Sequence, residues 1–261
     1  TLVDTFITSS YIEEDRWYGS FWENIDKKIQ KEIFFVPTVV DEGLIKFYKI
    51  LKGIRFSQKN YILKEDFLYL SDFIEAYKHK RRVKKINIGK SFLEGVDLTE
   101  LIKECWLLNR DVHSTMESFL TYKFIKNLSL KNVKVRLSID WFEGHSVDKM
   151  WNLAMYNYFP STKRIAYETF RSFPYYLSTY PIPIERESHT IPDIFAVQGP
   201  ACVEGIKEFL PDLEVISVPA FKNQHVWNDQ NTIIKNTNII LVAFPISLHT
   251  SVDMLESLIE N

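Results

Sequence analysis

Two carboxylates and a histidine stand close together near the middle of the chain. They are Asp140, Glu143 and His145, and each of these residue types can accept or donate a proton during a reaction near neutral pH. A carboxylate can also serve as the nucleophile in sugar chemistry. The same residues could instead cap a helix or keep a loop in water, and their spacing alone favours neither interpretation.

The segment around these residues predicts a strand, a short loop and a helix. Residues 133–140 alternate apolar and polar side chains, which is typical of a strand. Ser146 is a suitable N-cap for a helix that continues through Tyr156. Ligands of parallel α/β sheets bind outside the carboxyl ends of the strands, and free N–H groups at a helix start favour an anion. The loop that holds Asp140, Glu143 and His145 is therefore the candidate catalytic loop.

Strands and helices alternate through most of the chain. The other predicted strands are 2–7, 33–40, 164–167, 194–197, 215–218 and 238–244. The other predicted helices are 17–29, 44–51 ending at Gly53, 63–77, 97–108, 113–128, 201–210 and 250–259. This alternation predicts an α/β fold, with a Rossmann-like parallel sheet, helices on both faces, and an all-helical insertion over about 63–128.

Composition narrows the class of protein. The 261 residues are 46% hydrophobic and 15% aromatic, enough for a sizeable core, and the net charge of −2 argues against nucleic acid as a partner. Cys105 and Cys202 are expected to be buried thiols, and no His/Cys cluster or aspartate pair has metal-ligand spacing. No apolar run reaches the length of a membrane span and no signal peptide opens the chain, so we expect a cytoplasmic protein.

The densest run of charge follows the predicted helix 63–77, whose apolar face we expect to pack in the core. The run contains Lys78, Lys80, Arg81, Arg82, Lys84 and Lys85. These cations could simply be a solvated helix end, where positive charge suits the helix dipole. They could also rest on anionic lipid head groups, which would make the protein peripheral at the inner membrane.

A long connection lies between the predicted strands 164–167 and 194–197. Residues 180–192 contain three prolines and several charged side chains, so we expect a loop. It could overhang the carboxyl ends of the strands as a lid, or it could be an ordinary connection.

Several short motifs, in a fixed order, carry a resemblance to a known family. They are IDWFE at 139–143, DK at 148–149, FP at 159–160, AYETF at 166–170, IPDIFAVQG at 191–199, EVISVPAF at 214–221 and NIILVAFP at 238–245. This order resembles bacterial proteins of surface-carbohydrate biosynthesis (O-antigen, lipopolysaccharide or capsule). In particular, it is similar to the end of the first Rossmann-like domain of GT-B glycosyltransferases and the first strand of their second domain.

The resemblance implies transfer of a sugar from a nucleotide-activated donor to a glycan or lipid-linked acceptor, with no bound cofactor and no metal. Glu143 is then the first candidate for the base that deprotonates the acceptor hydroxyl, with Asp140 and His145 behind it. We expect the pKa of Glu143 to lie near neutrality, between the pull of helix N–H groups and desolvation by Trp141 and Phe142. The residues expected to bind substrate are Glu168, Arg171, Arg186, Glu187 and Gly199.

The same resemblance divides the chain into two parts. Residues 1–232 would be the acceptor-side domain, and residues 233–261 would be the first strand and helix of a truncated donor domain or a strand and helix added to the first. We expect a fragment of a longer enzyme, inactive without its donor domain. A non-catalytic binding or scaffold domain of a polysaccharide assembly complex and a nucleotide-sugar epimerase are the alternatives.

Overall fold

The computed structural model describes residues 1–7, 15, 17–39, 43–109, 114–168, 180–224 and 248–260. The chain divides into two units, Thr1–Gln224 and His225–Asn261. The predicted strand 238–244 and Arg171 lie outside the described residues. In the second unit the described element is helix α10 (Leu248–Glu260), which matches the predicted helix 250–259.

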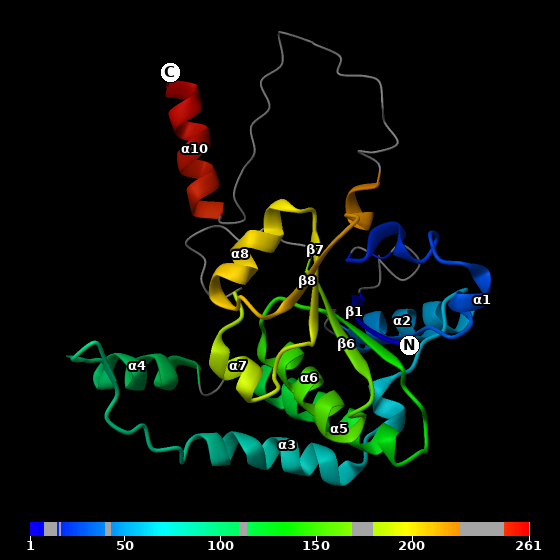
Figure 1. Ribbon diagram of the computed structural model, residues 1–261, viewed down its shortest axis with the longest axis horizontal. Helices are drawn as coiled ribbons and strands as arrows, with labels where there is room; N and C mark the ends of the chain where they lie inside the picture. The colour runs from blue at the N-terminus through cyan, green and yellow to red at the C-terminus, as the bar shows by residue number, and fades with distance from the viewer. Residues whose placement is uncertain are drawn as a thin grey trace. The chain divides into compact units, whose positions relative to one another are not determined.

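Six strands in the described part of the chain form one parallel sheet (Figure 1). They are β1 (Leu2–Ile7), β2 (Phe34–Val39), β5 (Leu137–Trp141), β6 (Lys163–Glu168), β7 (Ile194–Gln198) and β8 (Glu214–Val218). Their order is β2-β1-β5-β6-β7-β8, and every neighbouring pair is parallel. The predicted Rossmann-like α/β class is confirmed. The order reverses between β1 and β5, and this is the switch point where such sheets bind ligands.

Helices cover the sheet and extend away from it. They are α1 (Lys27–Gln30), α2 (Leu44–Phe56), α3 (Leu70–Val83), α4 (Thr99–Asn109), α5 (Ser114–Ser129), α6 (Ser146–Tyr158), α7 (Pro183–Glu187) and α8 (Ala201–Phe209), with 3-10 turns η1 (Gly19–Phe21), η2 (Lys64–Phe67) and η4 (Phe221–Asn223). A short antiparallel hairpin, β3 (Phe92–Leu93) and β4 (Val96–Asp97), lies between α3 and α4. The insertion is therefore not all helical, because Glu94 and Gly95 adopt positive φ and turn the chain back on itself.

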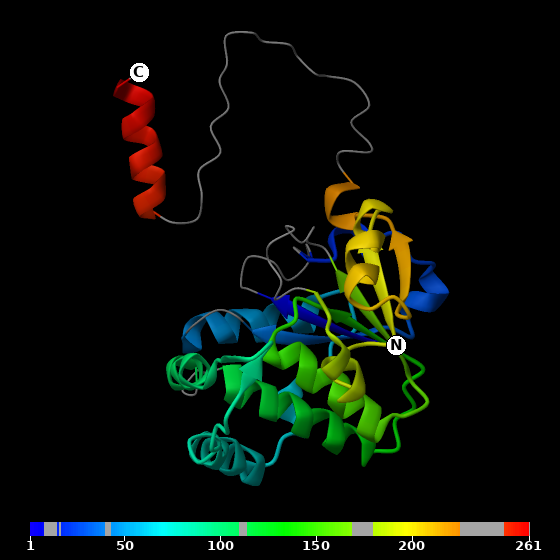
Figure 2. The ribbon, with the colours of Figure 1, turned by 60° about the vertical axis from the view of Figure 1, so that its left-hand side comes forward.

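Two faces of the sheet carry different cores. On one face, Phe124 of α5 and Trp151 and Met155 of α6 pack against Leu2 and Val36 of the strands. Figure 2 shows α5 and α6 side by side, with α3 beyond them. On the other face, an aromatic cluster closes over β1, β2, β5 and β6; its buried members include Tyr18, Phe35, Trp141 and Tyr167. Burial of these large side chains supplies most of the driving force for this fold.

The local structure corrects several expected boundaries. The predicted helix 17–29 is two short turns, because Gly19 takes φ +54° and Asp26 starts a new turn by accepting a hydrogen bond from the N–H of Lys28. The predicted strand from Val133 begins only at Leu137.

Three further expectations about helices also change. Helix α2 continues past Gly53 to Phe56. The segment 63–77 is a 3-10 turn followed by α3, and α7 lies within the expected loop 180–192.

The expectation of two buried thiols is also wrong, since Cys105 is exposed and Cys202 is half-buried.

Candidate functional site

The candidate catalytic loop follows the carboxyl end of β5 and brings Glu143 and His145 into contact. Nε2 of His145 lies 3.1 Å from Oε2 of Glu143. Nε1 of Trp141 donates a hydrogen bond to Oε1 of the same carboxylate over 2.7 Å. The Glu143 side chain retains 25% of its exposure and the His145 side chain 66%, so the pair lies at the surface of the molecule.

Asp148, in the first turn of α6, fixes the shape of this loop. Its Oδ2 accepts the backbone N–H of Glu143 over 3.0 Å and that of His145 over 2.9 Å. Gly144 makes the turn between them with φ +76°. These loop N–H groups therefore bind Asp148, and the carboxylate of Glu143 is held by side chains instead.

The hydrogen bond between them shifts the pKa values of the two groups in opposite directions. Burial alone would raise the pKa of Glu143, but hydrogen bonds from His145 and Trp141 together lower it below its ordinary value. The hydrogen bond to Glu143 raises the pKa of His145, against the opposing effect of partial burial. The expectation of a Glu143 pKa near neutrality is wrong, because the hydrogen bonds from His145 and Trp141 outweigh the effect of burial. Of the two, His145 has the pKa suited to proton transfer near neutral pH.

Asp140 lies beneath the loop rather than in it. Its side chain faces α6 and is 1% exposed, and Oδ2 accepts a 2.6 Å hydrogen bond from Nδ2 of Asn152. Asp4 on the neighbouring β1 and Asp148 are also buried. Among the described residues, Oδ1 of Asp140, Oδ1 of Asp148 and both carboxylate oxygens of Asp4 meet no hydrogen-bond partner. This trio is a buried acidic cluster at the switch point of the sheet.

Burial shifts the three carboxyls in the same direction. Desolvation raises the pKa of Asp4 to about 7, although Lys64 opposes the shift. It raises the pKa of Asp148 to about 6 and that of Asp140 well above its ordinary value, with the neighbouring acids adding to the shift of Asp140. Because Asp140 is buried, it can position the loop, but it cannot reach a bound substrate directly.

Aromatic rings and one cation flank the Glu143–His145 pair. The rings of Trp17 and Trp141 meet edge to face with centroids 4.9 Å apart. Nζ of Lys222 lies 5.7 Å from the centroid of Trp17 and 6.0 Å from that of Trp141, and its charge contributes to lowering the pKa of Glu143. Gly19 allows this approach, because a Cβ there would lie 2.4 Å from Cα of Lys222.

The remaining substrate-binding candidates do not share one place. Glu168 is the buried last residue of β6, and Gly199, with φ +93°, follows β7. Both are therefore at the carboxyl edge of the sheet, with the catalytic loop. Arg171 is not among the described residues.

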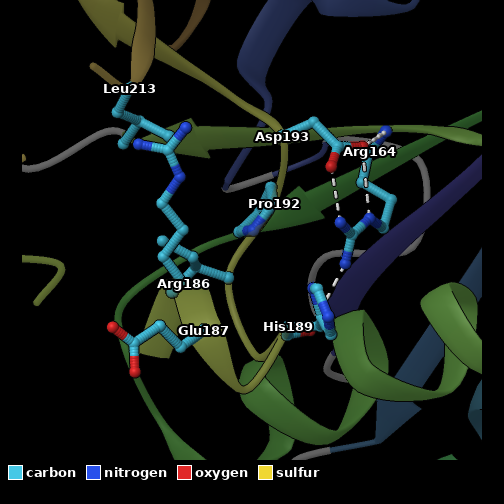
Figure 3. Close-up of a pocket in the computed structure, with 8 residues that line it drawn as sticks. Arg164, Arg186, Glu187, His189, Pro192, Asp193 and Leu213 are labelled. Atoms are coloured by element: carbon cyan, nitrogen blue, oxygen red, sulfur yellow. Dashed lines mark hydrogen bonds and ion pairs between the residues drawn. The ribbon is translucent and has the colours of Figure 1, made fainter. Parts of the chain in front are cut away.

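Arg186 and Glu187 lie at the opposite, amino edge. They line a pocket of about 510 Å³ with residues that precede or begin strands β6, β7 and β8, among them Arg164, Asp193 and Leu213 (Figure 3). Arg164 donates from Nε to Oδ2 of Asp193 over 3.2 Å. Since β6 runs from Lys163 to Glu168, its full length separates this pocket from Glu168.

The structure adds residues that were not marked as catalytic or substrate-binding from the sequence. These are Asp4, Asp148, Trp17 and Lys222. An acidic residue inside the apolar strand 2–7 was one signal, since a charge rarely lies on a buried strand without a reason. The others come together only through the pairing of distant strands.

Within the described ranges, no three His, Cys, Asp or Glu side chains come together as a metal site. None of the helices in these ranges is long and apolar enough to cross a membrane. Comparison with protein-family models, with curated proteins and with solved structures found no match. The fold and site define a Rossmann-like α/β protein with a Glu–His pair at the carboxyl edge of its sheet.

Proposed function

We propose that the protein transfers a sugar from a nucleotide-activated donor to the hydroxyl of a glycan or lipid-linked acceptor. The observation that carries the proposal is the Glu143–His145 contact of 3.1 Å, next to the switch point of a parallel sheet. The family resemblance of the motifs around this loop supports the same reaction class.

The pair supplies the proton transfer that the reaction needs. The acceptor oxygen bonds to the anomeric carbon, the bond from that carbon to the nucleotide phosphate breaks, and the hydroxyl proton must leave. His145 accepts this proton, while Glu143 orients the imidazole and raises its pKa. The half-buried ring of Trp17 offers an aromatic face against which a sugar or base ring can pack, and Lys222 offers a positive charge for a phosphate.

The proposal can be tested with the full-length protein and a panel of nucleotide sugars. Release of the nucleotide in the presence of candidate acceptors would be measured for the wild type, Glu143→Gln, His145→Gln and the double variant. We expect each single variant to lose about a hundredfold or more in turnover. The double variant should lose little more than either, because the two residues act as a unit.

Glu100→Gln on α4 is the matched control, since Glu100 is an exposed carboxylate in contact with Lys103. Full turnover by Glu143→Gln with an unchanged melting temperature would remove the pair from the mechanism. Specific binding of a glycan without any nucleotide release would instead favour the non-catalytic binding domain.

A further inference from the structure

Helix α3 presents its apolar side to solvent. Leu70, Phe73, Ile74 and Tyr77 are 78%, 42%, 49% and 60% exposed. Their spacing places them on one stripe of the helix, and Lys78 and Arg81 continue that stripe. With Arg81 and Lys78, three of these residues line a shallow hollow, so the expectation that this face packs in the core is wrong.

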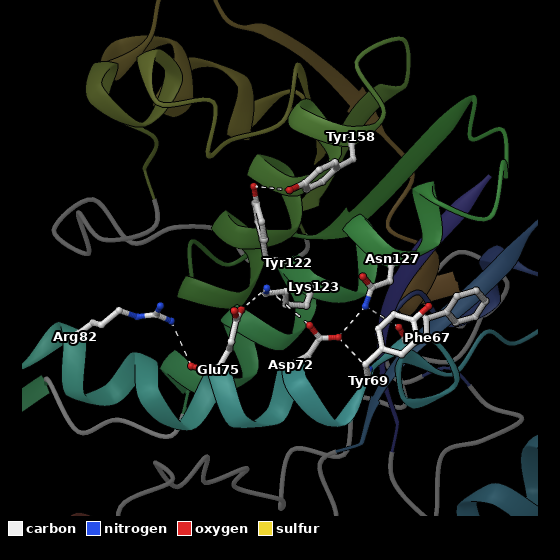
Figure 4. Close-up of polar contacts among 9 residues, drawn as sticks. All are labelled: Phe67, Tyr69, Asp72, Glu75, Arg82, Tyr122, Lys123, Asn127 and Tyr158. Atoms are coloured by element: carbon white, nitrogen blue, oxygen red, sulfur yellow. Dashed lines mark hydrogen bonds and ion pairs between the residues drawn. The ribbon is translucent and has the colours of Figure 1, made fainter.

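The opposite side of α3 is the one that packs against the protein. Asp72 and Ala76 are buried on it, and the ring of His79 stacks on Phe119 of α5 at a centroid distance of 5.1 Å. Lys123 of α5 pairs with both acids of α3, Asp72 at 3.8 Å and Glu75 (Figure 4). Ion pairs, a ring stack and the buried Ala76 therefore hold the helix, and its apolar stripe is left uncovered by the described residues.

Charge on this part of the chain has one sign. No acidic residue occurs between Glu75 and Glu94, and seven cations do: Lys78, Lys80, Arg81, Arg82, Lys84, Lys85 and Lys90. Because Glu75 and Asp72 face Lys123, the exposed stripe carries no acid of its own. The hairpin that follows adds Phe92, Leu93 and Val96, which are also exposed.

We propose that α3 and the basic run after it form a docking surface for a membrane rich in anionic lipid. The helix would lie in the plane of the interface, with Leu70, Phe73 and Ile74 among the acyl chains and the cations at the level of the phosphates. Tyr77 has the amphipathic ring that suits the head-group region. Protein interfaces are depleted of lysine at their centre, which argues against a second protein as the occupant. The surface does not depend on the proposed sugar transfer.

Vesicle sedimentation of the purified full-length protein tests the proposal. Two vesicle types are compared, phosphatidylcholine alone and phosphatidylcholine with about one third phosphatidylglycerol. We expect at least tenfold stronger partitioning to the anionic vesicles, weakening as salt is added. Phe73→Ser with Ile74→Ser should reduce binding to them about tenfold or more. Lys78→Glu with Arg81→Glu should remove the anionic preference, since each cation contributes about fivefold.

Helix α2 offers matched controls. Ile45 and Tyr48 are exposed apolar residues, and Lys49 and Lys52 are exposed cations. Ile45→Ser with Tyr48→Ser, and Lys49→Glu with Lys52→Glu, should leave vesicle binding unchanged. Circular dichroism melting would verify that every variant is folded, as expected for exposed positions.

Three results would overturn the proposal. One is equal binding to both vesicle types, or no binding to either. Another is an equal loss of binding in the α2 controls. The third is a concentration-dependent dimer, seen by light scattering, that Phe73→Ser with Ile74→Ser abolishes while vesicles remain unbound; the occupant would then be a second copy of the chain.

Discussion

Asn152 of helix α6 donates a 2.6 Å hydrogen bond from Nδ2 to Oδ2 of Asp140 on strand β5, and both side chains are almost completely buried. The same amide donates to the carbonyl oxygen of Asp148 over 2.9 Å. Asn152 thus connects the strand before the candidate catalytic loop to the helix after it. This buried contact therefore helps to fix the position of the loop between them.

Asp4→Asn should stabilise the protein at alkaline pH. In the unfolded chain a carboxyl ionises near pH 4, whereas burial raises the pKa of Asp4 in the folded protein to about 7. Between these values the folded state binds more protons than the unfolded state, so the free energy of unfolding falls as pH rises. Urea unfolding should show a gain on the order of 1–2 kcal/mol at pH 8 and none at pH 4. The exposed Asp66→Asn variant should show no such difference, and equal stabilities of wild type and Asp4→Asn at pH 8 would contradict the shift.

Glu143→Gln should lower the pKa of His145. The hydrogen bond to Glu143 is the largest cause of the raised pKa of His145, and this bond weakens when the partner becomes neutral. NMR titration of the His145 ring would show the change, with the wild type titrated in parallel. A His145 pKa that stays above 6.5 in this variant would mean that another group sets it.

The same pair also makes a small contribution to stability over a limited range of pH. The stability that follows from the raised pKa of His145 is fully present below about pH 6.5, and it is lost as the pH rises through the pKa of His145 in the folded protein. The stability that follows from the lowered pKa of Glu143 is present above about pH 4.5, and it is lost as the pH falls. Between these limits, the free energy of unfolding of the wild type should exceed that of Glu143→Gln by less than about 1 kcal/mol, because His145 is largely exposed to solvent.

Lys64→Met should destabilise the protein strongly. Nζ of Lys64 is buried and donates to Oγ1 of Thr38 over 2.6 Å, Oε1 of Glu117 over 2.9 Å and Oγ1 of Thr121 over 3.2 Å. Removal of Lys64 leaves these acceptors without their donor. We expect the free energy of unfolding, measured with urea, to fall by an amount on the order of 2–4 kcal/mol. Lys103→Met breaks an exposed pair with Glu100 and should cost less than about 1 kcal/mol. Similar losses in the two variants would be the contrary result.

Asp72→Ala should loosen α3 from α5. Oδ2 of Asp72 accepts the N–H of Tyr69 over 2.9 Å and Nδ2 of Asn127 over 2.8 Å, so one carboxylate both caps the helix and docks it (Figure 4). We expect faster amide hydrogen exchange over Leu70–Val83 and a loss on the order of 2 kcal/mol. Glu104→Ala on α4 is the surface control. Unchanged exchange in α3 would mean that its docking rests on other contacts.

Much of the sheet could be predicted from the sequence, because apolar runs and alternation are local properties. The strands that hold Leu2, Ile165, Phe195 and Val215 occur where their patterns indicate, and their parallel pairing follows from the helices between them. The positions of Asp140, Glu143 and His145 around a strand end and a helix start were equally local. The contact between Glu143 and His145 depends only on the four-residue loop between β5 and α6 and on the first turn of α6.

The rest depended on which distant segments meet. Asp4 joins Asp140 and Asp148 only because β1 pairs with β5, and a strand pairing is set by the whole core rather than by either strand. Arg186 is carried to the amino edge by the path of its connection. The amphipathic pattern of α3 predicted two unlike faces, but a pattern cannot say which face meets the protein. In the tertiary structure, the contact of Asp72 with Asn127 places the polar face of α3 against the protein. A buried carboxylate without hydrogen-bond partners costs more free energy than an exposed apolar stripe.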